Sequence, residues 1–314
     1  MLIVAGGYEG GLVGVEAPDP SEASASSPSS INSSVAPDEK SLAFRFLCSQ
    51  GSIRCLALGL DFLCCGGSDE TVQVYGLRNR KKHGDLLLSD GCITSVGAVG
   101  TIANGLLLIG NEHGLLHVYS VRHLNLLKQL KGHKRSITSV SVHPNGELAL
   151  SVSEDATVRL WDLKTFVCVF YSRLNGPSLA VEWHSDGKRY YILSESQLLL
   201  LSLSEDTSPC VQKAGISLKY CCATWVGDSV AVGCKSGAVV VYSPGSETPI
   251  VKDGVHTKRI KAITSFSGCI VTADSDGMLV CASVASGKGP GLSLSELWRY
   301  DVEMRVNALG CCAK

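Results

Sequence analysis

A two-strand pattern recurs seven times along the 314 residues of this chain. In each copy an apolar strand is followed by a short turn with Gly, Asp or Ser, and then by a strand in which apolar and polar residues alternate. The turns are centred on Glu9, Asp69, His113, Asp155, Ser196, Ser236 and Asp276. After a first gap of 60 residues, successive turns lie 44, 42, 41, 40 and 40 residues apart. This period is typical of the blades of a β-propeller, so the sequence predicts an all-β fold, a seven-bladed propeller.

The two remaining strands of each blade are also visible in the sequence. An alternating segment such as SITSVSV at 136–142 precedes each pair and can bury one face between neighbouring blades. A weaker strand, such as LNLLKQL at 124–130, comes before that segment and suits the outer edge of a blade.

The two ends of the chain complement each other. The N-terminus begins with the second half of a blade, whereas RVNALGCC at 305–312 is an inner strand without a blade of its own. We expect the C-terminal strand to pair with the N-terminal half-blade, which would close the propeller and cover its strand edges. Residues 1–314 are therefore predicted to form a single propeller domain.

Residues 17–40 interrupt the first blade and account for the long first gap. They contain eight serines, four prolines and no aromatic residue. Such a segment buries too little apolar surface to offset the entropy of ordering it. We therefore expect a disordered, Ser/Pro-rich insert at the surface.

Composition excludes several classes of protein. The 28 Lys and Arg residues are balanced by 29 Asp and Glu, which argues against a chain whose whole surface binds nucleic acid. A local basic patch is still compatible with that balance. No apolar run approaches the roughly 20 residues that a membrane span needs, and the N-terminus lacks the basic start of a secretory signal.

The 14 cysteines occur singly or as adjacent pairs, and never as C-x-x-C. Adjacent strand residues point to opposite faces of a sheet, so such pairs make poor metal chelators. We interpret the cysteines as small strand residues of a protein in a reducing compartment.

The fourth repeat, at residues 132–163, resembles the WD40 consensus, because it starts with Gly-His, has Asp in the turn and ends with Trp-Asp. In WD40 proteins the His, the turn Asp, a strand Ser and the Trp form a hydrogen-bonded chain. Here the resemblance assigns those places to His133, Asp155, Trp161 and either Ser151 or Ser153. The same residue types also occur in hydrolase triads, but this Ser lies inside a strand and no G-x-S-x-G turn is present. We expect a structural network and no catalytic residues.

Cofactor sites are not expected. His113, His117 and His123 are close in sequence, but no Cys or carboxylate group completes a metal-ligand pattern around them. Neither the phosphate-binding motif G-x-x-x-x-G-K-[ST] nor G-x-G-x-x-G followed by a helix occurs. The sequence therefore predicts no metal and no nucleotide cofactor.

Two basic features are candidate binding sites. The first is a basic loop that contains Arg78, Arg80, Lys81, Lys82 and His83. The second is a candidate rim, formed where the chain reaches the inner strands, and its residues are Arg54, Lys134, Arg135, Lys258, Arg259 and Arg305. These charges are either scattered and solvated, or a rim that docks an acidic peptide or the backbone of ribosomal RNA.

Three segments resemble one group within the WD40 proteins. They are LIVAGGYEGGLVGVE at 2–16, DETVQVYGLRNRKKHGDLLLSDGCITSV at 69–96 and HPNGELALSVSEDATVRLWDLKTF at 143–166. This group comprises the WD40 factors of large-ribosomal-subunit assembly, which are also described as proteins that interact with the p21-activated kinase. The resemblance implies a nucleolar, non-catalytic scaffold that docks assembly factors or pre-ribosomal RNA and is monomeric within its complex.

Other functions stay open at this stage. One alternative is a signalling adaptor, nuclear or cytoplasmic, that binds and restrains a kinase of the p21-activated type. A substrate receptor of a ubiquitin ligase is disfavoured, since the Trp161-Asp162 pair is followed by Leu163 and Lys164, and Lys cannot reproduce the planar fork of Arg. A propeller enzyme would need convergent carboxylates or metal ligands, and none can be identified.

Overall fold

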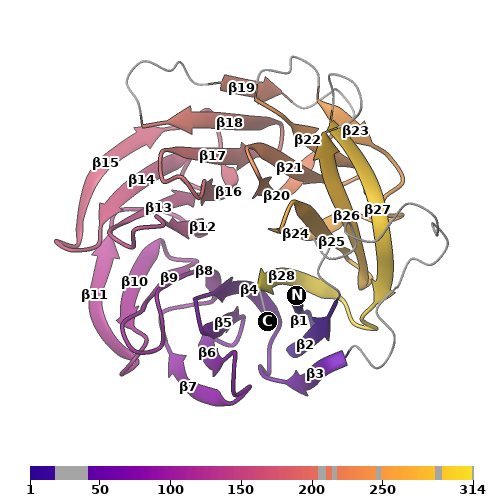
Figure 1. Cartoon of the computed structure of the whole chain (residues 1–314). Coiled ribbons are helices and arrows are strands. Elements are labelled where there is room, and N and C mark those ends of the chain that lie inside the picture. The colour runs from indigo at the N-terminus through magenta and orange to yellow at the C-terminus, as the bar shows by residue number, and fades with distance from the viewer. Residues whose placement is uncertain (18–41, 204–209, 214–217, 245–248, 287–291, 313–314) are drawn as a thin grey trace. The chain divides into compact units, whose positions relative to one another are not determined.

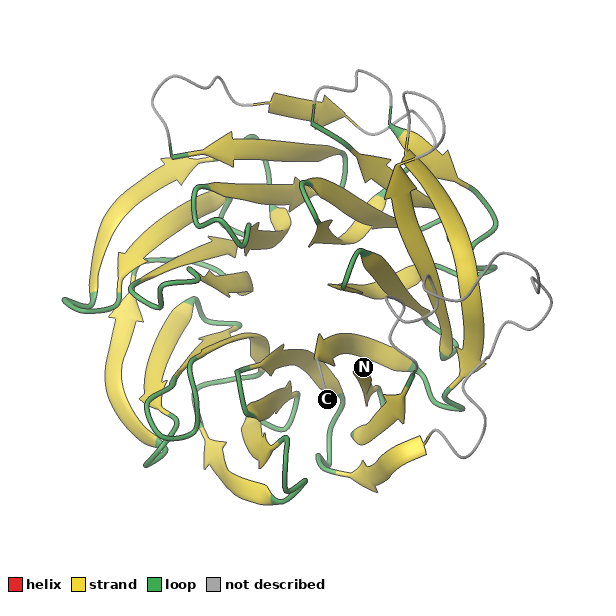
Figure 2. Cartoon of the chain, in the orientation of Figure 1, coloured by secondary structure: helices red, strands yellow, loops and turns green. Residues whose placement is uncertain are grey.

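The computed structural model describes residues 1–17, 42–203, 210–213, 218–244, 249–286 and 292–312. Throughout these ranges the regular secondary structure is β-strand (Figure 2). Apart from Ala17, the predicted insert at 17–40 lies outside the described residues. Ala17 itself is buried, and its backbone carbonyl accepts a 2.8 Å hydrogen bond from the amino group of Met1.

The strands divide between two compact units. We call Ser49–Ser217 the central unit, and Met1–Cys48 with Leu218–Lys314 the terminal unit. The central unit contains four blades, whose strands are β4 (Ile53–Leu58), β5 (Phe62–Gly67), β6 (Thr71–Gly76) and β7 (Lys82–Leu87); β8 (Ile93–Val99), β9 (Leu106–Asn111), β10 (Leu115–Ser120) and β11 (Asn125–Lys131); β12 (Ile137–Val142), β13 (Leu148–Ser153), β14 (Thr157–Asp162) and β15 (Val167–Arg173); β16 (Ser178–Trp183), β17 (Arg189–Ser194), β18 (Gln197–Ser202) and β19 (Cys210–Lys213).

The terminal unit contains three blades. Their strands are β20 (Tyr220–Val226), β21 (Ser229–Cys234), β22 (Val239–Tyr242) and β23 (Ile250–Lys252); β24 (Ile260–Phe266), β25 (Cys269–Asp274), β26 (Met278–Ser286) and β27 (Leu292–Asp301); β28 (Val306–Cys312), β1 (Leu2–Gly7), β2 (Gly11–Glu16) and β3 (Leu42–Leu47). Every sheet is four-stranded and antiparallel (Figure 1). The predicted seven-bladed β-propeller is confirmed, while the single domain over residues 1–314 stays a prediction.

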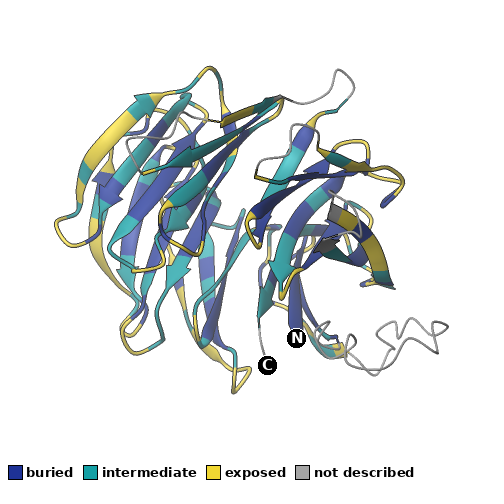
Figure 3. Cartoon of the chain, turned by 45° about the horizontal axis from the view of Figure 1, so that its top comes forward, coloured by how far each residue is buried: buried dark blue, intermediate teal, exposed yellow. Residues whose placement is uncertain are grey.

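Burial explains the strand sequences. Within each unit the first strand of a blade contacts the first strand of the next blade, and we call it the inner strand. Second strands such as β5 and β21 are buried along their whole length, so their sequences are almost continuously small or apolar. Fourth strands such as β11 lie at the edge of their sheets and are largely exposed (Figure 3).

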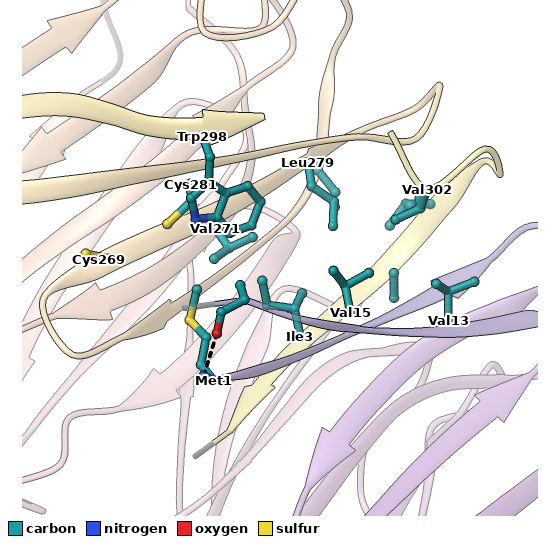
Figure 4. Packing of buried hydrophobic residues seen from close by; sticks show 14 residues of the cluster. Met1, Ile3, Val13, Val15, Cys269, Val271, Leu279, Cys281, Trp298 and Val302 are labelled. Carbon is teal, nitrogen blue, oxygen red and sulfur yellow. Dashed lines mark hydrogen bonds between the residues drawn. The ribbon is translucent and has the colours of Figure 1, made fainter. Parts of the chain in front are cut away.

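The C-terminal strand completes the N-terminal blade, as predicted. β28 pairs antiparallel with β1, with Leu2 opposite Cys312 and Gly6 opposite Ala308. Side chains of this blade share a core with the blade β24–β27 of the same unit. In that core, Ile3 lies in one cluster with Leu279 and Trp298 (Figure 4). The two ends of the sequence are therefore held together by backbone hydrogen bonds and by apolar burial.

Candidate functional site

A buried hydrogen-bond chain runs through the blade β12–β15. The Nδ1 atom of His133 lies 3.2 Å from a carboxylate oxygen of Asp155, and its Nε2 atom lies 2.7 Å from Ser151 Oγ. The indole N–H of Trp161 donates to the same Ser151 hydroxyl at 2.8 Å. Each partner comes from a different part of the blade: the loop before β12, the turn after β13, β13 itself and β14.

Of the two candidate serines, Ser151 and not Ser153 takes part in this hydrogen-bond network. Ser153 instead donates to the backbone carbonyl of Arg135 at 3.0 Å. With Nδ1–H donating to the carboxylate, Nε2 accepts the Ser151 hydroxyl proton, and the hydroxyl oxygen accepts the Trp161 N–H. Each of these four side chains then has a hydrogen-bond partner, and Ser151, which has no exposed surface, is held in place without access to a substrate.

A second network lies in the blade β24–β27, and sequence reasoning missed it. His256 Nδ1 lies 3.2 Å from Asp274 Oδ2, and His256 Nε2 lies 2.8 Å from Thr272 Oγ1. The available signal was His256 itself, which precedes the first residue of its inner strand, Ile260, by the same four positions that separate His133 from Ile137.

Burial favours the neutral form of both histidines. Neither side chain has exposed surface, and loss of hydration lowers the pKa of His133 and of His256 below the ordinary value of 6.5. The neighbouring carboxylates act in the opposite direction but do not cancel the effect of burial. For Asp155, burial alone would raise the pKa, yet hydrogen bonds led by the one from Thr157 lower it below 3.8. A neutral imidazole beside a charged carboxylate is therefore the favoured state in the first network.

The candidate rim consists of exposed side chains, and the two units contribute three each. Arg54, Lys134 and Arg135 belong to the central unit, and the other three belong to the terminal unit. Arg54 lies within the inner strand β4 and not in the loop before it. Lys134-Arg135 and Lys258-Arg259 lie in equivalent loops, before the inner strands β12 and β24. The two pairs are offset by one residue, because Arg135 and Lys258 each lie two residues before the first Ile of the inner strand.

In the terminal unit, Lys258, Arg259 and Arg305 directly precede inner strands. Arg259 comes immediately before β24, and Arg305 comes immediately before β28. The Arg305 guanidinium lies 5.8 Å from the ring centroid of Tyr8, within the range of a cation–π contact. Inner strands β24 and β28 contact each other, so these cations occupy neighbouring blades on one edge of the unit.

The basic loop is a tight turn between β6 and β7. Arg78, Arg80 and Lys81 lie in the turn, whereas Lys82 and His83 are the first residues of β7. All five side chains are exposed, and Lys82 forms a 3.3 Å ion pair with Asp85. Strands alternate in direction across the sheet, so this turn lies at the end of the blade opposite the start of β4. The basic loop and Arg54 therefore do not form one site.

The histidines near residue 117 are not brought together as ligands. His113 is an exposed turn residue, and His123 lies in the turn before β11. His117 is buried in β10, where its Nε2 atom lies 3.0 Å from the Gln129 side chain and 3.3 Å from Asp90. Across the described ranges, no group of three His, Cys, Asp or Glu side chains is arranged to hold a metal ion. All 14 cysteines lie in those ranges, and each is a free thiol.

Comparisons with known proteins give a consistent family. A family model described as WD domain, G-beta repeat, matches residues 124–162. The chain is 32% identical over 233 residues to the p21-activated protein kinase-interacting protein 1-like of Danio rerio, covering 73% of this chain and 62% of that relative. Protein MAK11 of Saccharomyces cerevisiae is 32% identical over 122 residues, covering 35% of this chain and 30% of that relative. The chain thus spans less than two thirds of the Danio rerio relative's length.

A solved structure agrees on the fold. The β-propeller domain of Myceliophteria thermophila Cps50 (Swd1) superimposes with a TM-score of 0.55 at 15% identity, covering 66% of this chain and 72% of that one. None of the described residues belongs to a helix with the length and hydrophobicity of a membrane span. The hydrogen-bonded His–Ser–Trp blade and these comparisons together show that the chain folds as a WD40 β-propeller and is similar to the p21-activated protein kinase-interacting proteins.

Proposed function

We propose that this chain is a non-catalytic scaffold that docks assembly factors or pre-ribosomal RNA while the large ribosomal subunit is built in the nucleolus. Its relation to the p21-activated protein kinase-interacting proteins and to MAK11 supports the proposal. The assembly role itself comes from the group that the three sequence segments resemble. Partner, location and role in assembly all belong to the proposal.

The observation that supports the scaffold function is a difference between buried and exposed polar groups. The histidines, hydroxyls and carboxylates that resemble catalytic groups are occupied in hydrogen bonds inside two blades. The candidate rim, by contrast, presents its cations to solvent. Exposed charges on strand-connecting loops suit recognition of another macromolecule, because a rigid scaffold holds them in fixed positions.

A signalling adaptor is the second candidate. The names of the relatives favour it, since they describe proteins that interact with the p21-activated kinase. Under this proposal the chain binds a regulatory segment of such a kinase and restrains its activity. Ribosomal RNA would then play no part in the complex.

Affinity purification separates the two candidates. The tagged chain would be isolated from cell extract, and its bound proteins and RNA identified before and after RNase treatment. The scaffold proposal predicts precursor RNA of the large subunit together with assembly factors. Stoichiometric recovery of a kinase without precursor RNA, and unchanged by RNase, would favour the adaptor and contradict the assembly role.

A further inference from the structure

One backbone hydrogen bond recurs at the start of the inner strands and identifies equivalent positions. It joins the residue after the second strand to the carbonyl of the residue before the inner strand. In the terminal unit these bonds run from Tyr8 to Arg305, from Lys235 to Lys219 and from Ser275 to Arg259. In the central unit they run from Ser68 to Ser52, from Glu112 to Cys92 and from Glu154 to Ser136. The residues before the inner strands can therefore be compared position by position.

The two units differ in charge at this position. In the terminal unit all three residues are cationic: Lys219, Arg259 and Arg305. In the central unit all four residues are uncharged: Ser52, Cys92, Ser136 and Pro177. Across the hydrogen bond, the terminal unit adds Lys235, whereas the central unit places Glu112 and Glu154 there. A random scatter of solvated charges does not explain a cation at every blade of one unit and at none of the other.

The three cations form a row, one per blade. β24 contacts both β20 and β28, so the strands that follow Lys219, Arg259 and Arg305 lie side by side (Figure 1). All three side chains are exposed. Lys258 adds a further exposed cation, and neither it nor Arg259 forms an ion pair within the described ranges. We call Lys219, Lys235, Lys258, Arg259 and Arg305 the basic row.

Nearby acidic groups limit the kind of ligand that fits. Glu9 follows Tyr8 and Asp276 follows Ser275, so each of these exposed carboxylates comes one residue after a backbone hydrogen bond to the basic row. A nucleic acid adds a phosphate at every nucleotide and would be repelled by these two residues. An acidic peptide spaces its carboxylates with neutral residues and carries backbone N–H donors, which can face Glu9 and Asp276.

We infer that the basic row of the terminal unit binds an acidic, extended segment of a partner protein. Lys258, Arg259 and Arg305 pair with carboxylates of the segment, Lys219 and Lys235 add to the positive charge of the row, and Tyr8, held beneath the Arg305 guanidinium, offers an aromatic face to the apolar parts of the segment. This inference deepens the scaffold function and rests on it, because it names the chemistry of a docked partner.

The test measures binding of two defined probes by fluorescence anisotropy. The first probe is a short labelled peptide in which Glu alternates with Ser, and the second is single-stranded polyuridine RNA with the same number of negative charges. The variant is the triple charge reversal Lys219→Glu, Arg259→Glu and Arg305→Glu. Its matched control reverses three charges of the basic loop, with Arg78→Glu, Arg80→Glu and Lys81→Glu. A neutral triple variant, with Gln at positions 219, 259 and 305, covers the case in which charge reversal disturbs folding.

We expect the wild-type chain to bind the peptide more tightly than the RNA, with an affinity that falls as salt is raised. The triple reversal should weaken peptide binding by at least about tenfold, the neutral variant by less, and the control by less than about twofold. Tighter binding of the RNA would overturn the choice of a protein segment, and equal losses in variant and control would overturn the site. If the triple variant still assembles into the complexes that the wild-type chain enters, the inference fails while the scaffold function survives.

Discussion

Two blades, one in each unit, build the same buried network from different residues. In the blade β12–β15, His133 is linked to Asp155, which lies in the turn after the second strand, and through Ser151 to Trp161. In the blade β24–β27, His256 is linked to Thr272 and to Asp274. Asp274 is equivalent to Ser153 of the other blade, because each pairs with the first residue of its inner strand. The carboxylate of the second network therefore comes from a position two residues before the one that Asp155 occupies.

The second network has no tryptophan, and its carboxylate is held by more backbone hydrogen bonds. Ala282 occupies the position of Trp161, as the pairing of these strands with β25 and β13 shows. Asp274 accepts, through Oδ1, the backbone N–H groups of Asp276, Gly277 and Met278, whereas Asp155 accepts those of Lys134 and Thr157. The comparison teaches that these two blades keep a buried, fully paired histidine while they fix its carboxylate in different ways.

Removing the tryptophan should have the largest effect on stability. Trp161→Ala gives the blade β12–β15 the residue that the blade β24–β27 has naturally. It also leaves a cavity in the cluster around Leu108 and Leu116 and removes the donor to Ser151. We expect a loss of about 3–5 kcal/mol in the free energy of unfolding, measured by denaturant titration. Trp161→Phe, which keeps most of the volume, should lose about 1–2 kcal/mol. Equal losses for the two variants would show that the hydrogen bond, and not the packed volume, is decisive.

Removing the carboxylates should distinguish the two networks. Asp274→Ala removes the acceptor of the His256 N–H and of three backbone N–H groups. We therefore expect a loss of about 3 kcal/mol in the free energy of unfolding. Asp155→Ala should lose about 1–2 kcal/mol, because water can reach part of the site that its carboxylate leaves. The same titrations measure both variants. The reverse order of losses would contradict the greater dependence of the second blade on its carboxylate.

Acidification should weaken both blades. The unfolded histidines bind a proton with a pKa near 6.5, whereas burial lowers the pKa of His133 and His256 in the folded chain. At pH below 6.5 the unfolded state therefore binds more protons, and the unfolding free energy falls as the pH is lowered from 7.5 toward 5. Thermal unfolding over this range would test the effect, with the double variant His133→Asn and His256→Asn as control. An identical pH dependence in that variant would exclude these histidines as its source.

Charge reversal on the rim should have the smallest effect on stability. Lys134→Glu, Arg135→Glu and Lys258→Glu change exposed side chains, so each should alter the unfolding free energy by no more than about 0.5 kcal/mol. The variants should nevertheless bind a partner less tightly. A large drop in the melting temperature would contradict their placement on an exposed surface.

The fold could be predicted because the sequence consists of repeats. The period of about 40 residues predicts blades. The inner strand RVNALGCC supplies what the N-terminal half-blade lacks, and this predicts the pairing of β28 with β1. Strand alternation needs no knowledge of distant contacts, so local sequence suffices for it.

The candidate site was less accessible to sequence reasoning. His133, Asp155 and Trp161 follow a consensus, whereas His256 has no Trp and its Asp lies at another position, so only the three-dimensional register reveals the second network. Three residues of the basic row, Lys258, Arg259 and Arg305, could be identified as candidates from the sequence. Lys219 does not, because its equivalence to Arg259 depends on a backbone hydrogen bond that spacing alone does not fix.

Sedimentation of the tagged full chain on a sucrose gradient, with the bound RNA identified, tests the proposed role in ribosome assembly most directly. The scaffold proposal predicts migration with precursors of the large ribosomal subunit, and release toward the top of the gradient when those particles are disrupted. Migration as a free chain, or in a small complex that contains a kinase and no precursor RNA, would contradict it.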